Sequence, residues 1–270
     1  ALAEAYYDAI DPTGIKTTLE DWKQSNGFNA ALAAGRVIEP RFRDTKDLGY
    51  GRGLRVWTTP EGDFFSFVEN FQVRTVSGNE YTDLNLDALI NDEREHHFGT
   101  NAIEYSTWPY GAGEPCAFGS GSPCATTNPD PPRFTKFYTF DATRGNQQAE
   151  DHANETRLNM VDLDGRGDKS MPGACVYCHG GVVRPLRADG SFRDNCYDGV
   201  NGLDNSACNG LDGDVNAKLQ LLEVNSFAFW HTSPHTQAEE EPKIKAVNLA
   251  IYCTYPGASP EACVNAFCAT

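Results

Sequence analysis

The sequence has few methionines, few basic residues for its length and no long apolar segment. Only two of its 270 residues are methionine, and 22 Lys and Arg stand against 38 Asp and Glu, which gives a formal net charge of −16. Because phosphate backbones bind proteins through Lys and Arg, this balance argues against nucleic acid and against an anionic membrane surface as partners. No stretch approaches the roughly 20 apolar residues that cross a bilayer. We expect no membrane span and a cationic rather than an anionic partner.

Composition and residue patterns predict a folded α+β protein. The chain is 40% hydrophobic and 22% charged, which is typical of globular proteins. Alternating apolar residues predict strands over 53–58, 64–73, 101–106 and 133–140, the first two forming a hairpin. Helical patterns cover 3–10, 18–24, 84–91 and 239–251. The segment 218–229 fits a helix or a strand. We expect a β-rich region with N-terminal helices over 1–150 and a loop-rich, helical region over 151–270, within one compact unit.

Cys175, Cys178 and His179 form a C-x-x-C-H sequence, the attachment motif of c-type haem. Two thiols three positions apart can reach both vinyl groups on one edge of the porphyrin, and the adjacent histidine supplies the proximal iron ligand. A thioredoxin-type site would need the motif between a strand and a helix, and two glycines follow it at once. A zinc ribbon would need a second C-x-x-C, which the sequence lacks. We therefore expect one covalent haem c, attached after export to the periplasm or the cell exterior.

The seven remaining cysteines indicate disulfide bonds. Three pairs bracket short loops rich in Gly, Pro, Asn and Asp: Cys116 with Cys124, Cys196 with Cys208, and Cys253 with Cys263. Such loops are typical of disulfides formed in an oxidising compartment, which agrees with export. Because seven is an odd number, one cysteine is left over, either Cys268 or one of Cys253 and Cys263. An unpaired cysteine in an exported protein can link two copies of the chain.

The sequence leaves the second axial iron ligand open. Both methionines, Met160 and Met171, precede the motif, so none follows it as in small cytochromes c. His96 or His97 is the leading candidate, although an adjacent pair among charged residues also fits an ordinary surface site. Two protein ligands on the iron favour electron transfer, whereas a vacant position permits binding or turnover of a small molecule.

Acidic residues just before the motif suggest a second cation site. Asp162, Asp164 and Asp168 alternate with apolar residues and glycines, and a further Asp- and Asn-rich loop covers 194–214. Closely spaced carboxylates on a flexible loop suit Ca²⁺, which takes six to eight oxygen ligands. Neither loop matches the EF-hand pattern, and any turn uses the same residue types. Calcium is therefore a candidate ligand beside ordinary turn formation.

Motifs spread over most of residues 47–250 resemble those of a group of exported, largely uncharacterised bacterial monohaem c-type cytochrome proteins. The matching segments are Asp47–Arg52, Phe67–Phe71, Ala102–Ser106, Lys136–Asp141, Asp162–Lys169, Pro172–Gly181 and Gly213–Leu219. The resemblance implies export and covalent haem, without a settled reaction. A fainter likeness links the chain to β-rich monohaem cytochromes that oxidise hydroxylamine. In those proteins a lysine is cross-linked to the porphyrin, and no lysine here matches it.

Three functions follow from a single covalent haem. The first is an electron carrier that exchanges electrons with a redox partner protein. The second is a haem enzyme with an open distal site that acts on a small oxidant or a nitrogen compound, with an acid/base group beside the iron. The third is a protomer of an extracellular electron-conducting assembly, joined through the odd cysteine or a sheet edge. The state of the second axial position decides between the first two.

Overall fold

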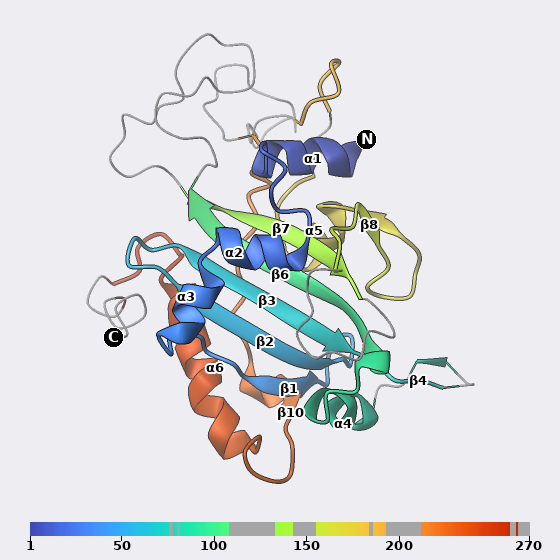
Figure 1. Cartoon of the computed structure of the whole chain (residues 1–270), viewed down its shortest axis with the longest axis vertical. Helices are drawn as coiled ribbons and strands as arrows, with labels where there is room; N and C mark the ends of the chain where they lie inside the picture. Colours follow the sequence, from blue (N-terminus) through green and yellow to red (C-terminus); the bar gives the residue numbers. More distant parts are fainter. Residues whose placement is uncertain are drawn as a thin grey trace.

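A computed structural model describes residues 1–75, 78–79, 82–107, 133–142, 155–183, 186–192, 212–259 and 263 (Figure 1). Its centre is a six-stranded antiparallel sheet in the order β10-β1-β2-β3-β6-β7. The strands of this sheet are β1 (Arg41–Asp44), β2 (Gly51–Thr58), β3 (Phe64–Phe71), β6 (His97–Thr107), β7 (Arg133–Asp141) and β10 (Phe227–Ala228). Two small hairpins lie outside it: β4 (Arg74–Thr75) with β5 (Gly78–Asn79), and β8 (Met160–Val161) with β9 (Lys169–Ser170).

Six α-helices and two short 3-10 helices lie around the sheet in the described residues. The helices are α1 (Leu2–Ile10), α2 (Leu19–Ser25), α3 (Phe28–Ala33), α4 (Leu84–Ile90), η1 (Arg94–His96), α5 (Gly173–His179), η3 (Val224–Ser226) and α6 (Gln237–Tyr252). None of the helices in the described ranges is long and apolar enough to cross a membrane. The α+β class predicted from the sequence is confirmed.

One face of the sheet is covered by the N-terminal helices (Figure 1). Trp57 of β2 lies opposite Phe65 of β3, and alternation places Phe67 on the same face. Trp22 of α2 meets Trp57 at 5.5 Å between ring centroids, and Phe28 of α3 meets it at 5.1 Å. All five rings are buried. Burial of each stabilises the fold by roughly 1.5–3 kcal/mol relative to exposure, so this aromatic face anchors α2 and α3.

The opposite face of the sheet carries α5 and α6. Val56 and Phe64 point to this side and pack against Val247 and Ile251 of α6. Nearer the β7 edge, Phe137 lies 5.2 Å from the ring of His179, the last residue of α5. The two helices therefore pack on different strands of the same face of the sheet.

Two glycines in β2 let α4 lie directly on the sheet. A Cβ at Gly51 would contact the carbonyl oxygen of Asn85, and a Cβ at Gly53 would come within 3.1 Å of the Leu89 side chain. Glycine inside a strand often marks such a close approach. The helix predicted over 84–91 is thereby fixed at the end of the sheet near β1 and β2.

The hairpin, the later strands and the N-cap expected from the sequence are all present. Thr18 caps α2, its Oγ1 accepting a hydrogen bond from the Asp21 amide at 3.1 Å. The ambiguous segment 218–229 is neither a full helix nor a full strand: it is extended, then forms η3 and β10. Asn248 of α6 holds its backbone at Leu222 by hydrogen bonds of 2.7 and 2.8 Å. Because β10 pairs with β1, the region 151–270 contributes a strand to the sheet of the region 1–150.

Candidate functional site

The C-x-x-C-H motif forms most of α5, a helix that the sequence patterns do not predict. Cys175 is buried, with 8% exposure, and its Sγ lies 4.0 Å from the Sδ of Met171. Cys178 is exposed, and neither cysteine is in a disulfide bond. Residues three apart on a helix lie on the same side of it, so Cys175 and Cys178 share one side of α5. Cys175 is at the buried part of that side and Cys178 at the exposed part.

A single extended segment, 215–220, positions His179. The His179 carbonyl accepts a hydrogen bond from the Lys218 amide at 3.1 Å, and the Val182 amide donates to Val215 at 2.8 Å. The side-chain amide of Gln220 donates to the Cys178 carbonyl. Hydrogen bonds at Cys178, His179 and Val182 therefore hold the end of the motif against the segment 215–220.

The hydrogen bond to the imidazole ring determines which nitrogen of His179 is free. Its Nδ1 lies 3.3 Å from the Lys218 carbonyl oxygen, which can only accept a hydrogen bond. Nδ1 therefore carries the hydrogen, and Nε2 keeps its lone pair for a metal. Burial lowers the pKa of His179, the Lys218 hydrogen bond opposes this, and Arg52 adds to the lowering. The ring is neutral at pH 7, the form that ligates iron.

Both thiols of the motif have raised pKa values, unlike cysteines that react as thiolates. Burial raises the pKa of Cys175 to about 12, and the nearby Cys178 contributes. Burial also raises the pKa of Cys178, with a further contribution from Asp47. Reactive redox cysteines instead have lowered pKa values and react as thiolates. A thioether carries no charge, so two thioether bonds at these sulfurs are compatible with their surroundings.

An apolar groove lies beside His179 on the α5 and α6 side of the sheet. It is open to solvent and has a cavity volume of about 130 Å³, which is below the roughly 300–1,000 Å³ of small-molecule and cofactor sites. The groove is lined by Phe42, Arg52, Leu54, Val56, Phe64, Ser66, Val68, Asn101, Ile103, His179, Leu219, Gln220, Leu222, Val247 and Ile251. Its lining is mostly aliphatic and aromatic. Of the three motif residues, His179 lines the groove, whereas Cys175 and Cys178 do not.

The predicted distal ligands lie elsewhere. Neither His96 nor His97 lines the groove. His96 belongs to η1 and lies 3.8 Å from Glu93. His97 begins β6, is buried, and its Nε2 lies 3.2 Å from the hydroxyl of Thr100. The structure therefore does not bring either residue together with the haem motif.

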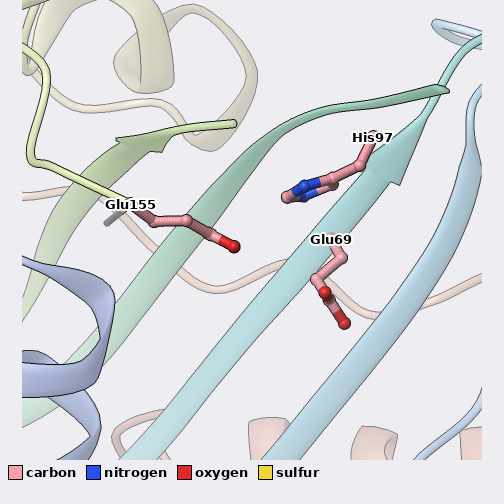
Figure 2. A group of neighbouring side chains, drawn as sticks. All are labelled: Glu69, His97 and Glu155. Carbon is pink, nitrogen blue, oxygen red and sulfur yellow. The ribbon is translucent and has the colours of Figure 1, made fainter. Parts of the chain in front are cut away.

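His97 instead belongs to a buried cluster with Glu69 and Glu155 (Figure 2). One ligand atom from each of the three residues lies within 4.8 Å of the others, and this is the one such group among the described residues. The Thr100 hydroxyl links two of them, since it donates to Glu155 at 2.9 Å and contacts His97. One imidazole and two carboxylates form a donor set that can hold a divalent cation.

Two arginines lie beside this cluster. Glu69 pairs with Arg94 at 2.6 Å and also with Arg55. The same two arginines pair with Asp92 and Glu39, so two guanidiniums face four carboxylates when Glu155 is included. The sequence motifs do not identify Glu69. Glu69 is two positions from both Phe67 and Phe71 in β3, so it is on the same buried face of the strand, and this spacing could have indicated a buried acid.

The aspartates proposed for calcium do not gather into one site. Asp164 pairs with Lys169 at 2.6 Å, and this hydrogen bond is the main cause of its lowered pKa. Asp162 keeps one buried carboxylate oxygen without a hydrogen-bond partner among the described residues. Asp168 is exposed. Because a lysine ammonium already occupies the position beside Asp164, the geometry gives no support to a calcium ion there.

One predicted disulfide lies in the described residues. Cys253 and Cys263 are bonded, with their Cα atoms 5.5 Å apart, just after α6. Cys116, Cys124, Cys196, Cys208 and Cys268 lie outside the described residues, as do His152 and most of the loop 194–214. The disulfide is consistent with a protein that folds in an oxidising compartment.

Comparison with family models, curated proteins and solved structures gave no match for this chain. The site must therefore be interpreted from its own residues and geometry.

Proposed function

We propose that this chain is an exported c-type cytochrome that carries electrons through one covalently attached haem. Cys175 and Cys178 would hold the haem by thioether bonds, and Nε2 of His179 would ligate its iron. The observation that carries the proposal is the orientation of His179: Nδ1 is engaged by the Lys218 carbonyl, and the ring lines an apolar groove. When bound, the haem supplies one-electron redox chemistry.

Other uses of C-x-x-C-H explain these observations less well. A zinc or dithiol site would account for the two sulfurs but not for an imidazole beside an apolar groove. The raised pKa values of both thiols also oppose a reactive dithiol. The Cys253–Cys263 disulfide supports export, which haem c attachment requires. The formal net charge of −16 supports a cationic redox partner.

Haem attachment can be tested directly by expressing the exported chain together with a cytochrome c maturation system. We expect the mass of the mature protein to rise by one haem and to stay raised after denaturation. Cys175→Ala and Cys178→Ala should each lose one of the two thioether bonds. The matched control is Cys253→Ser with Cys263→Ser, which removes two cysteines outside the motif and should keep full attachment. A wild-type mass without haem, while a reference cytochrome matures in the same cells, would contradict the proposal.

A second function, binding or turnover of a small molecule, is supported by the groove lining. Among the described residues that line the groove, His179 alone is of a type that commonly ligates haem iron through nitrogen or sulfur. The other described histidines and methionines have contacts elsewhere: for example, His235 lies 2.7 Å from Glu240, and Met171 contacts Cys175. This arrangement favours an open second axial position.

Carbon monoxide separates the two functions. If the second position is open, the absorption spectrum of the reduced protein should be high-spin and should shift when carbon monoxide is added. If a residue fills that position, the spectrum should be low-spin and unchanged, which supports the electron carrier. His152→Ala would then show whether that residue, outside the described ranges, is the ligand. His97→Ala is the control, because His97 does not line the groove.

A further inference from the structure

One buried carboxylate on the aromatic face of the sheet contacts two lysines. Glu104 of β6 lies opposite Phe65 of β3 and Lys136 of β7, so its side chain is on the face that α2 covers, and it is 1% exposed. Its oxygens accept hydrogen bonds from Nζ of Lys16 at 2.8 and 3.0 Å, and Oε1 lies 3.6 Å from Nζ of Lys136. No second carboxylate of the described residues pairs with either lysine. One positive charge therefore lacks a partner in a largely buried site, which is costly.

The side-chain amide of Asn26 contacts the same carboxylate. Its Nδ2 donates to Oε2 of Glu104 at 2.9 Å, and Oε2 is also the oxygen that Lys16 contacts at 2.8 Å. An amine and a carboxamide therefore meet at one oxygen atom. Tyr138 donates its hydroxyl hydrogen to Oε1 at 3.4 Å, and its ring lies beside that of Trp22, 6.3 Å between centroids, with both rings buried. These aromatic rings limit the access of water to the reacting groups.

Hydrogen bonds hold the backbone at both groups. The Lys16 amide donates to the Asp11 carboxylate at 3.0 Å, and the Lys16 carbonyl accepts a hydrogen bond from Arg157 at 3.2 Å. Asn26 is the C-cap of α2, and its carbonyl accepts a hydrogen bond from Nε1 of Trp57 at 2.8 Å. Two groups held side by side in this way react far more readily than the same groups free in solution, because little entropy remains to be lost.

We propose that Lys16 and Asn26 form an isopeptide bond, with Glu104 as the catalytic residue. The Glu104 carboxylate accepts a proton from Nζ of Lys16, because only the neutral amine is a nucleophile. Nζ then bonds to Cγ of Asn26, the Cγ–Nδ2 bond breaks, and Glu104 passes the proton to the departing nitrogen. Both protons that Nζ gives up leave with Nδ2 as an ammonium ion, so the step needs no oxidant, reductant or further reactant. The reaction does not depend on the proposed haem.

The bond would also balance the charges of the site. It removes the positive charge of Lys16 and leaves Glu104 with Lys136, so that one carboxylate then faces one ammonium group. Lys16 precedes α2 and Asn26 ends it, so the bond ties the two ends of this helix together. A cross-link of this kind restrains the unfolded chain and stabilises the fold.

The mass of the full chain, measured after denaturation and reduction of its disulfides, tests the proposal. We expect the wild type to lack the mass of one ammonia molecule relative to its sequence, apart from any attached haem. Trypsin cannot cleave after a modified Lys16, so digestion should release a peptide that ends at Lys23 joined to the peptide 24–36. Fragmentation of this joined peptide should place the bond between Lys16 and Asn26.

Three variants should lose the bond and keep the full mass. Lys16→Arg keeps the charge beside Glu104 without the reactive amine, and Asn26→Ala removes the carboxamide. Glu104→Gln keeps the shape of the side chain but cannot accept the proton, and the other two variants serve if it fails to fold. Lys23→Arg is the matched control: Lys23 lies in α2 and pairs with Glu20 at 2.9 Å, so the joined peptide should form as in the wild type.

Three outcomes contradict the proposal. A wild-type chain with its full mass would overturn it. A loss of ammonia that persists in Lys16→Arg would also overturn it, because Asn26 precedes Gly27 and such a pair can lose ammonia by closing a ring onto the backbone. A joined peptide at the wild-type level in Glu104→Gln would overturn the role of Glu104. Haem attachment changes the mass separately, by a much larger amount and in the opposite direction.

Discussion

Gly181 shows how closely the end of the haem motif is packed against the segment 215–217. Its φ is +98°, and a Cβ there would contact the carbonyl oxygen of Val215 and approach the Ala217 amide nitrogen to 3.0 Å. We expect Gly181→Ala to lose about 1–2 kcal/mol through the positive φ, and about 1–3 kcal/mol more through crowding. Chemical denaturation of the variant measures the sum.

Gly165→Ala is the matched control for this prediction. Gly165 also has a positive φ, +72°, but nothing lies within 4 Å of the position that an added Cβ would take, so only the backbone strain should appear. Equal losses in the two variants would show that the packing beside His179 tolerates an extra methyl group. A larger loss at Gly181, together with an altered His179 environment, would confirm that this glycine helps to place the ligand.

Lys136 is a buried cation whose titration should be visible in the stability of the protein. Burial lowers its pKa to about 8, against the opposing attraction of Glu104. Between pH 8 and pH 10.5 the unfolded chain therefore binds more protons at this site than the folded one, so the free energy of unfolding should rise with pH there. The rise is on the order of 3 kcal/mol.

The variant Lys136→Met should lack this rise. Tyr6 and Tyr138 have raised pKa values because of burial, so they lower the stability of both proteins above pH 10 and cancel in the difference. The measurement is urea unfolding of the wild type and the variant at several pH values from 7 to 10.5. A difference that does not change with pH would mean that Lys136 is charged throughout this range.

At the residue scale, the sequence shows the C-x-x-C-H motif but not the residues that surround it in the fold. The spacing of Cys175, Cys178 and His179 is local, so it can be recognised without the fold. The groove beside His179 gives no comparable signal, because its lining comes from several separate segments of the chain. Residue type alone makes His97 a candidate iron ligand, and the sheet instead places it in the cluster with Glu69 and Glu155.

At the scale of elements, two N-caps on opposite sides of the sheet should contribute independently. Thr236 forms a capping box with Glu239 at the start of α6, and Thr18 caps α2. Thr236→Ala and Thr18→Ala should each cost about 1 kcal/mol, and their costs should add in the double variant because they share no partner.

Thermal unfolding of the single and double variants measures these costs. Thr17→Ala is the control: Thr17 is next to a cap, and its hydroxyl makes only an exposed hydrogen bond to Asp21 at 3.2 Å, so the loss should stay below about 0.5 kcal/mol. A double variant whose cost differs clearly from the sum of the two singles would show that the two caps are energetically coupled.

Local signals account for which elements were predictable. The strands over 53–58 and 64–73 alternate apolar and polar residues around a Pro- and Gly-containing turn, and the structure has them as β2 and β3. The segment 218–229 contacts α6, lines the groove and pairs with β1. Its apolar residues therefore follow neither the helical nor the strand periodicity. Helix α5 is only seven residues long and is held by tertiary contacts.

At the scale of the whole molecule, 38 acidic residues against 22 basic ones give a net charge of −16. This net charge should make the stability of the fold depend on salt. Like charges repel across the folded surface more than in the expanded chain, which lowers the free energy of unfolding. Salt screens exposed charges beyond about 10 Å at 0.1 M, and buried pairs such as Lys16 with Glu104 much less. We expect the thermal unfolding midpoint at pH 7 to rise as sodium chloride increases from about 0.01 to 0.1 M.

The pH dependence of this salt effect identifies its origin. As the pH falls below 5, Asp and Glu side chains become protonated, the net negative charge decreases, and the rise with salt should shrink. If the midpoint fell with salt at pH 7, attractive ion pairs at the surface would outweigh the repulsion. In the proposed function, the same field attracts a cationic redox partner, so the association rate should fall over the salt range in which the midpoint rises. One charge distribution would then account for both effects.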